Sequence, residues 1–351
     1  MHCGANVAAA EAMHAMRLSS PGTIAMRPLT PVDLATPSPE PGEVVLAVAA
    51  CGVCRTDLQL CAGDLVAHRL PIVPGHQIVG RVVAIGEGAT GWAIDDRAGV
   101  AWLASACGVC ARCLEGRENL CADARFTGWD RDGGYATHVS VRADFALRIP
   151  DSFDDLAAAP LLCGGVIGYR ALKISGVRPG QRLGLFGYGA SALLAHQVAR
   201  HWGCKVYVCT RSERERARAI GLGAEWAGDY LERPPVPLDA AVTFAPVGSV
   251  VIAALESLDR GGTVAINAIH LDGIPAFSYD ALWWERSLRS VANFTRADAR
   301  EFLELAAQIP IRTTFDVHPL AEANRALLDL EAGLVDGAAV LEMPRAQPSP
   351  V

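Results

Sequence analysis

The sequence predicts an α/β protein of two domains, one of which is built on a doubly wound parallel sheet. Two observations carry this prediction. A glycine-rich turn, GYGASA at residues 187–192, stands between an apolar strand-like run and an amphipathic helical stretch. Further strand-like runs at 204–210, 238–245, 261–267 and 288–294 alternate with helical stretches such as 249–260, which is typical of a parallel sheet covered by helices. A length of 351 residues is sufficient for two domains.

Composition excludes several classes of protein. Apolar residues make up 51% and charged residues 20%, which is normal for a folded chain and argues against disorder. The net charge of −7 makes nucleic acid an unexpected partner, and no uninterrupted apolar run is long enough to span a bilayer. Residues 1–12 are expected to form a loose tail, because the N-terminus lacks the basic start and apolar core of a secretion signal. Eleven cysteines without such a signal indicate a reducing compartment, and we expect the cytoplasm.

Four cysteines lie in one short segment with the spacing C-x2-C-x2-C-x7-C, namely Cys107, Cys110, Cys113 and Cys121. The short steps let neighbouring thiolates converge on one ion, which suits tetrahedral zinc. Iron–sulfur ligation is the open alternative, whereas disulfides form poorly in a reducing compartment. A closed four-sulfur site has no vacant position for a substrate, so we expect a structural zinc that braces residues 105–121.

A second set of potential metal ligands is spread along the chain. Cys51 and Cys54 follow a strand-like run, His76 lies in a Pro/Gly turn ahead of another strand, and Cys163 precedes a helical pattern. One histidine with two cysteines is a set that catalytic zinc uses, because three protein ligands leave the fourth position for water or substrate. A lone cysteine is usually a small buried hydrophobe, so spacing alone leaves this set undecided.

The glycine-rich turn fits a dinucleotide. Its pattern is G-x-G-x-x-A, with alanine in the third place as the fingerprint allows. Gly187 permits the tight turn and Gly189 lets the backbone approach the pyrophosphate. The backbone N–H groups of Ala190 and Ser191, at the start of the helix, suit an anion.

The next strand ends in Thr210, Arg211 and Ser212, where NAD-dependent enzymes place an acid that binds the ribose 2′-hydroxyl. An acid would repel a 2′-phosphate, whereas two hydroxyls and a guanidinium would bind one. We therefore expect NADP(H) to be preferred over NAD(H). The alternative is that these residues only begin a solvated helix of alternating Arg and Glu.

Together the motifs resemble the zinc-containing alcohol dehydrogenases of the medium-chain dehydrogenase/reductase superfamily. GVCRTDL at 52–58, PGH at 74–76, the four-cysteine segment and the glycine-rich turn occur in that family's order, and the resemblance runs from about residue 16 to about residue 343. The segments 287–307 and 333–341 are similar to a bacterial subgroup. The resemblance implies a discontinuous, mainly β, GroES-like catalytic domain (1–160 and 296–351), a Rossmann cofactor domain (161–295), two zinc ions per chain and a homodimer or homotetramer.

The resemblance also implies roles for single residues. It makes Cys54, His76 and Cys163 the catalytic zinc ligands, with Cys51 packed nearby. Asp57 would accept a hydrogen bond from the free ring N–H of His76, although a capping residue is an equal alternative.

Other residues of the implied site depend on the resemblance alone. The proton relay would begin at the Thr56 hydroxyl, and Gln59 stands where many relatives carry a histidine. Arg55 matches a position that contacts pyrophosphate. Leu65 and Trp102 match the wall of the substrate pocket, with ordinary core packing as the alternative.

The implied reaction is zinc-assisted hydride transfer between NADP(H) and a medium or bulky primary alcohol or aldehyde, in a cleft between the two domains. Gln59 replaces a histidine, and Gln77 replaces the acid that usually follows the histidine ligand. These departures keep open a reductase of activated C=C or C=N bonds. A protein that binds zinc and nucleotide without turnover is the third hypothesis.

Overall fold

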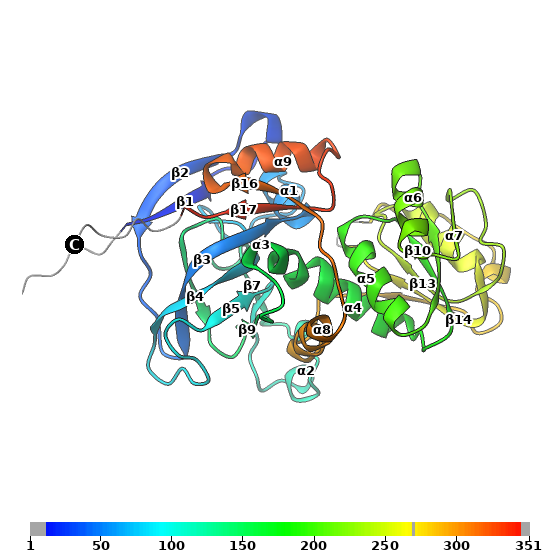
Figure 1. Cartoon of the computed structure of the whole chain (residues 1–351), viewed down its shortest axis with the longest axis horizontal. Coiled ribbons are helices and arrows are strands. Elements are labelled where there is room, and N and C mark those ends of the chain that lie inside the picture. Colours follow the sequence, from blue (N-terminus) through cyan, green and yellow to red (C-terminus); the bar gives the residue numbers. More distant parts are fainter. Residues whose placement is uncertain (1–11, 269–270, 345–351) are drawn as a thin grey trace, which may run out of the picture.

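The structure is a computed structural model that describes residues 12–268 and 271–344. The expected loose tail at 1–12 lies outside the described residues except for its last member. Two bodies lie at opposite ends of the long axis, with helices α4 (Gly164–Ser175), α5 (Ala190–His201) and α8 (Arg296–Gln308) between them (Figure 1).

The first body contains a seven-stranded mixed sheet of order β16-β17-β3-β4-β5-β9, and β8 also pairs with β3. These strands are β3 (Glu43–Val53), β4 (Gln77–Ile85), β5 (Arg97–Val100), β8 (His138–Arg142), β9 (Leu147–Arg148), β16 (Phe315–Pro319) and β17 (Ala338–Glu342). The C-terminal strand β17 runs antiparallel to β3, with Ala339 opposite Val53. The end of the chain therefore completes the sheet that the N-terminal third begins, although the domain boundaries at 160/161 and 295/296 stay a prediction.

Shorter elements surround this sheet. Helix α1 (Arg55–Ala62) follows β3, and α9 (Ala323–Glu331) lies between β16 and β17 in the chain. A hairpin of β1 (Ala12–Leu18) and β2 (Leu29–Ala35) forms a separate two-stranded sheet. Strands β6 (Leu103–Ser105) and β7 (Arg125–Phe126) form the base of a lobe that also holds α2 (Ala111–Leu114), and Figure 1 shows this lobe below α8. The described residues also contain five 3-10 helices: η1 (Ile24–Met26), η2 (Glu118–Leu120), η3 (Ala159–Leu162), η4 (Tyr279–Ala281) and η5 (Leu320–Glu322). Of these, η4 lies in the chain between two strands of the second body, β14 (Leu258–Ile266) and β15 (Ser287–Ser290).

The second body confirms the predicted doubly wound sheet. Six parallel strands have the order β12-β11-β10-β13-β14-β15, which places the first strand of the unit at the centre of the sheet. They are β10 (Arg182–Phe186), β11 (Lys205–Cys209), β12 (Trp226–Gly228), β13 (Leu238–Thr243), β14 (Leu258–Ile266) and β15 (Ser287–Ser290), with helices α5, α6 (Glu213–Gly221) and α7 (Gly248–Glu256) between them in the chain. Strand β15 ends earlier than predicted, because the chain leaves the sheet after Ser290 and continues into α8.

Helix α4 packs closely against its neighbours because it begins with two glycines. A side chain at Gly165 would collide with the ring of Phe302 on α8, at 2.4 Å from its nearest atom. The run from helix α3 (Asp155–Ala158) to the end of α4 is long and apolar enough to cross a membrane by composition, but most of it is buried inside the protein. We therefore interpret Asp155–Ser175 as a core segment.

Candidate active site

Cys54 stands at the point where the buried strand β3 turns into α1. It is the N-cap residue of α1, and its Sγ accepts a hydrogen bond from Thr56 N at 3.3 Å. Asp57, in the first turn, accepts a hydrogen bond from Cys54 N through Oδ2 at 2.9 Å. This reciprocal cap fixes the Cys54 side chain at the end of the sheet.

His76 precedes β4 and is almost completely buried. Its Nδ1 lies 3.2 Å from Oδ1 of Asp57, the same atom that accepts a hydrogen bond from Gly75 N at 3.2 Å. Asp57 therefore caps α1 with one oxygen and orients His76 with the other, so both interpretations of this residue describe a real contact. With Nδ1 held by the carboxylate, Nε2 faces Cys54 Sγ at 3.3 Å.

Cys163 completes the group from a distant part of the chain. It is the N-cap residue of α4 but makes no side-chain hydrogen bond to that helix. The ligand atoms of Cys54, His76 and Cys163 all lie within 4.8 Å of one another.

The electrostatics of this cluster favour a cation. A hydrogen bond from Cys163, together with the nearby His76, lowers the pKa of the Cys54 thiol despite its burial. Burial disfavours a charged His76, but the negative charges of Cys54 and Asp57 outweigh it and raise the pKa of the imidazole. A thiolate, a second thiol and an imidazole nitrogen form the donor set that three-ligand zinc sites use, so the residues fit that metal.

Cys51 is not part of the cluster. It is fully buried, and burial together with the charge of Asp57 raises the pKa of its thiol. Its Sγ lies 2.9 Å from the position of a Cβ at Gly75 or at Gly134, so the thiol fills a close-packed corner beside two glycines.

An aromatic cluster lies beside His76, and sequence reasoning found only one of its members. The rings of Trp102 and His76 are 6.2 Å apart between centroids. Trp102 also packs against Phe126 at 4.6 Å and Trp129 at 5.8 Å. Trp129 stacks in turn on His68 at 3.8 Å. Only the pairing of β6 with β7 brings these segments together, so no local pattern could have indicated Phe126 and Trp129.

The four-cysteine lobe has the geometry of a metal site. Its four Sγ atoms lie within 4.8 Å of one another, and the 3.9 Å separation of the Cys107 and Cys113 sulfurs excludes a disulfide between them. Backbone N–H groups of Val109 and Cys110 lower the pKa of Cys107 to about 7, which favours a thiolate ligand.

The lobe is bonded to the segment that leaves the second body. Glu118 accepts hydrogen bonds from N and Nε of Arg296, the first residue of α8. Asn119 donates a hydrogen bond to Ala292 O at 2.6 Å. A metal in the lobe would therefore brace the crossing between the two bodies.

The glycine-rich turn has the geometry that a dinucleotide needs. Gly187 has φ +90°, and a side chain there would lie 2.8 Å from Ala245 N. Gly189 is the N-cap residue of α5, and a Cβ there would meet no atom within 4 Å. Open space beside the start of the helix leaves the N–H groups of Ala190 and Ser191 accessible to an anion.

Helix α4 links the metal cluster to this turn. A Cβ at Gly164, next to Cys163, would lie 3.3 Å from Ser191 Oγ. A Cβ at Gly168 would lie 3.0 Å from Ser191 O and 3.3 Å from Ala195 Cβ. The first turn of α5 thus packs directly on the helix that begins at Cys163, which sets the separation between the metal cluster and the cofactor turn.

The end of β11 holds an acid that sequence reasoning missed. Thr210 is buried, and its hydroxyl donates a hydrogen bond to Glu215 Oε2. Arg216 donates to the carbonyl oxygens of Thr210 and Arg211 at 2.8 and 3.0 Å. The Arg211 side chain is exposed, and Ser212 caps α6. No acidic residue directly follows the strand, but the Glu215 carboxylate contacts Thr210 from the first turn of α6.

The remaining predicted residues lie near α1. Thr56 is buried, Gln59 is half-buried, and Arg55 is exposed at the start of the helix. Leu65 is half-buried, and its backbone N donates to Gln59 O at 3.1 Å. Within residues 12–268 and 271–344, no hydrogen bond of the Thr56 or Gln59 side chain assigns a proton relay to either residue.

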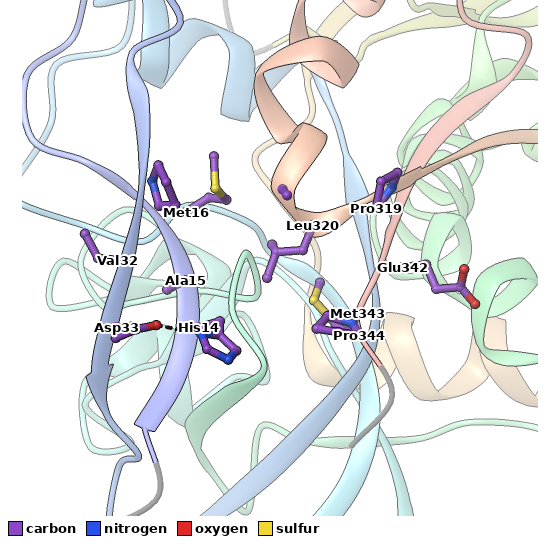
Figure 2. Close-up of a pocket in the computed structure, with 12 residues that line it drawn as sticks. His14, Ala15, Met16, Val32, Asp33, Pro319, Leu320, Glu342, Met343 and Pro344 are labelled. Atoms are coloured by element: carbon purple, nitrogen blue, oxygen red, sulfur yellow. Dashed lines mark hydrogen bonds and ion pairs between the residues drawn. The ribbon is translucent and has the colours of Figure 1, made fainter. Parts of the chain in front are cut away.

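A cavity elsewhere on the first body is lined by none of the metal-cluster residues and by no residue of the glycine-rich turn. Its volume is about 630 Å³, and it lies between the β1–β2 hairpin and segments 319–321 and 342–344 (Figure 2). His14 Nδ1 lies 2.6 Å from Asp33 Oδ1, a contact drawn as a dashed line in Figure 2, and both side chains are largely exposed. The other lining residues are mainly aliphatic or proline, so we assign this cavity no part in the site.

Comparison with known proteins agrees with this geometry. Residues 40–151 match the family described as "Alcohol dehydrogenase GroES-like domain", and residues 192–308 match "Zinc-binding dehydrogenase". The chain is 50% identical over 335 residues to the "Probable alcohol dehydrogenase AdhA" of Mycobacterium tuberculosis, covering 94% of this chain and 97% of that one.

Solved structures share the whole fold. A cinnamyl alcohol dehydrogenase (SbCAD4) from Sorghum bicolor superposes with a TM-score of 0.87 at 25% identity, covering 96% of this chain and 100% of that one. A cobalt- and zinc-bound thermostable alcohol dehydrogenase from Pyrobaculum aerophilum gives a TM-score of 0.85 at 26% identity, covering 95% and 100%. The chain therefore belongs to the zinc-containing alcohol dehydrogenases of the medium-chain dehydrogenase/reductase superfamily, a family of oxidoreductases.

Proposed function

We propose that the protein is a zinc-dependent alcohol dehydrogenase that transfers hydride between NADP(H) and a medium or bulky primary alcohol or aldehyde. The observation that carries this proposal is the convergence of Cys54, His76 and Cys163 on one point, with Cys163 at the start of the helix that packs on the cofactor turn. Family membership and the Mycobacterium tuberculosis relative support it.

Two zinc ions per chain belong to this proposal. Cys54, His76 and Cys163 would hold the catalytic ion, and the four cysteines of the lobe would hold the structural one. Zinc with an open position supplies Lewis acidity toward an alcohol or carbonyl oxygen, and the nicotinamide cofactor supplies or accepts hydride.

The chain's own residues position these groups. Asp57 holds the proton on His76 Nδ1 and so leaves Nε2 free for the metal. Gly187 and Gly189 let the cofactor approach the backbone, and the N–H groups at the start of α5 bind its pyrophosphate. Arg55 is assigned as a second pyrophosphate contact, and Thr56 with Gln59 as the start of the proton path.

The preference for NADP(H) is supported by the end of β11. Arg211 is exposed there and is followed by Ser212, and the residue directly after the strand is Thr210 rather than an acid. Guanidinium and hydroxyl groups suit a 2′-phosphate.

A bulky substrate is supported by the aromatic cluster. Trp102 lies 6.2 Å from His76 between ring centroids and is backed by Phe126 and Trp129. Aromatic walls beside a metal suit an apolar or aromatic substrate, with Leu65 as a further wall residue. The Sorghum bicolor structure is of a cinnamyl alcohol dehydrogenase, which is consistent with such a substrate.

The central test combines metal content with a substrate screen. The purified protein should contain two zinc ions per chain and should reduce aliphatic and aromatic aldehydes with NADPH, followed by absorbance at the nicotinamide band. Cys163→Ser should lose one zinc and the activity, and Cys204→Ser, a buried cysteine outside both clusters, should lose neither. Faster turnover of enones or iminium compounds than of aldehydes would favour the C=C or C=N reductase that Gln59 and Gln77 keep open.

The cofactor preference has a separate test. Arg211→Ala should weaken NADPH binding about tenfold and leave NADH binding nearly unchanged, because only the 2′-phosphate needs the guanidinium. Arg214→Ala removes the same charge from another exposed residue, in the first turn of α6, and is the matched control. Equal losses for NADPH and NADH in Arg211→Ala would contradict this preference.

We also propose a cytoplasmic homodimer or homotetramer. The eleven cysteines, which suit a reducing compartment, support the location, and the family resemblance supports the assembly. Light scattering coupled to gel filtration would give the subunit number, and a monomeric mass would contradict the second part.

A further inference from the structure

We propose that Glu215 is a specificity-determining residue that weakens binding of the cofactor's 2′-phosphate, so that the preference for NADPH over NADH is modest and can be enlarged by a single substitution. This inference rests on the proposed function in one respect, namely that the cofactor's ribose lies at the end of β11. It does not depend on which substrate is reduced.

The first observation is the position of the Glu215 carboxylate. Glu215 belongs to α6, yet its Oε2 accepts the hydrogen bond of the Thr210 hydroxyl, directly after β11. Gly187 N donates to Cys209 O at 2.8 Å, so the cofactor turn and this strand end are bonded neighbours. In dinucleotide-binding sheets this strand end is where the adenosine ribose binds.

The second observation comes from comparing Glu215 with two other acids at the same helix position. Asp57 and Asp298 each occupy the third position of a helix and return a hydrogen bond to the backbone N–H of their N-cap residue. Ser212 caps α6 and receives a hydrogen bond from Glu215 N at 3.3 Å, so the sequence Ser-x-x-Glu predicts the same reciprocal cap. The structure shows the Glu215 carboxylate bonded to Thr210 instead.

The third observation is the charge around Thr210. Arg216 points its guanidinium at the carbonyl oxygens of Thr210 and Arg211, and Arg211 is exposed. Charges of both signs therefore lie around the place where the ribose would bind, and Glu215 is the acid that is hydrogen-bonded to Thr210. The cations attract a 2′-phosphate, whereas the carboxylate repels it and accepts a hydrogen bond from a 2′-hydroxyl just as well as from Thr210.

These contacts predict that the Glu215 carboxylate weakens the binding of NADPH and has little effect on the binding of NADH. A 2′-phosphate carries nearly two negative charges, so it meets repulsion from Glu215 and must also compete for the Thr210 hydroxyl. At a separation of roughly 6 Å in water, one such charge pair changes affinity by about tenfold. A 2′-hydroxyl meets no such repulsion.

The test compares Glu215→Gln with Glu213→Gln. Both substitutions remove one negative charge from the first turn of α6, but Glu213 is exposed and has no recorded bond to Thr210. The probes are 2′,5′-ADP and 5′-AMP, which report the adenosine half of the site alone, followed by NADPH and NADH, all measured as dissociation constants by calorimetry or nucleotide fluorescence.

We expect Glu215→Gln to tighten 2′,5′-ADP and NADPH about tenfold and to change 5′-AMP and NADH by less than about threefold. Glu213→Gln should change all four by less than about threefold. If Glu215→Gln shifts the ratio of the two fragments no more than Glu213→Gln does, the inference is wrong. Should Glu215→Gln fail to fold, Glu215→Ala tests the same charge with a strong helix former.

The outcome is distinguishable from failure of the proposed function. A wild-type protein that reduces no aldehyde, while Glu215→Gln still shifts the fragment ratio, would overturn the reaction and leave this inference standing. An active dehydrogenase whose fragment ratio is unaffected by Glu215→Gln would do the reverse.

Discussion

The three donors that contact the Asp57 carboxylate make the sharpest prediction about the metal cluster. Asp57→Asn keeps the shape of the side chain but replaces one acceptor oxygen with an NH₂ donor. In the structure Oδ1 accepts from His76 and Gly75, and Oδ2 accepts from Cys54 N. An amide cannot serve all three donors, because whichever group its NH₂ faces is also a donor.

The magnitude follows from the contacts that are lost. If the amide oxygen keeps His76 and Gly75, the cap on Cys54 N is lost, which costs about 1 kcal/mol of stability. Loss of the carboxylate charge behind His76 also weakens the metal ligand, and such changes typically reduce metal affinity about 10- to 100-fold. That range corresponds to about 1.4–2.8 kcal/mol of binding free energy.

The assay is competition for zinc by a chromogenic chelator, with thermal unfolding measured in parallel. We expect one tightly held zinc to remain in the four-cysteine lobe and the other to be released at chelator concentrations that leave the wild type intact. Asp154→Asn is the control, since Asp154 caps α3 and lies outside the metal cluster. If both variants lose stability equally and both retain their zinc, Asp57 is only a capping residue and the reasoning about His76 is wrong.

Three further predictions concern the framework. Cys121→Ser should lose the structural zinc and lower the unfolding temperature by several degrees, because the lobe holds segment 292–296; unchanged metal content and melting would contradict this. Gly168→Val should destabilise the protein by about 1–3 kcal/mol in denaturant unfolding, since a side chain there meets α5 at 3.0 Å. The hydrogen bond from Arg182 lowers the pKa of Asp239, so its contribution is present above the unfolded pKa and is lost as pH falls through the folded one. The wild type should therefore lose about 1 kcal/mol more unfolding free energy than Asp239→Asn when the pH is lowered through the pKa of Asp239. Equal losses in the two proteins would refute the assignment.

The sequence predicted the chemistry-bearing pieces well because each is encoded locally. The strand, glycine turn and helix at 182–201 appear as predicted, since the apolar pattern and Gly187 are sufficient to specify them. The four cysteines also converge as their short spacing requires. The resemblance chose Cys54 rather than Cys51, and the structure places Cys54 with His76 and Cys163.

Other features could not be predicted because they depend on side chains from separate elements. Phe126 and Trp129 join Trp102 only because β6 pairs with β7. Glu215 is five residues from Thr210 in the chain, and which partner its carboxylate takes depends on how α6 lies against β11.

The sequence by itself determined which elements form, which residues carry thiols, imidazole and glycine turns, and in what order they occur. Only the tertiary structure decided that Asp57 bonds both its helix and His76, that α4 joins the metal cluster to the cofactor turn, and that an acid faces the end of β11. The physical reason is that turns and apolar periodicity act over a few residues. The direction of a buried side chain, and its distance from a group elsewhere in the chain, are fixed only when whole helices and strands pack against one another.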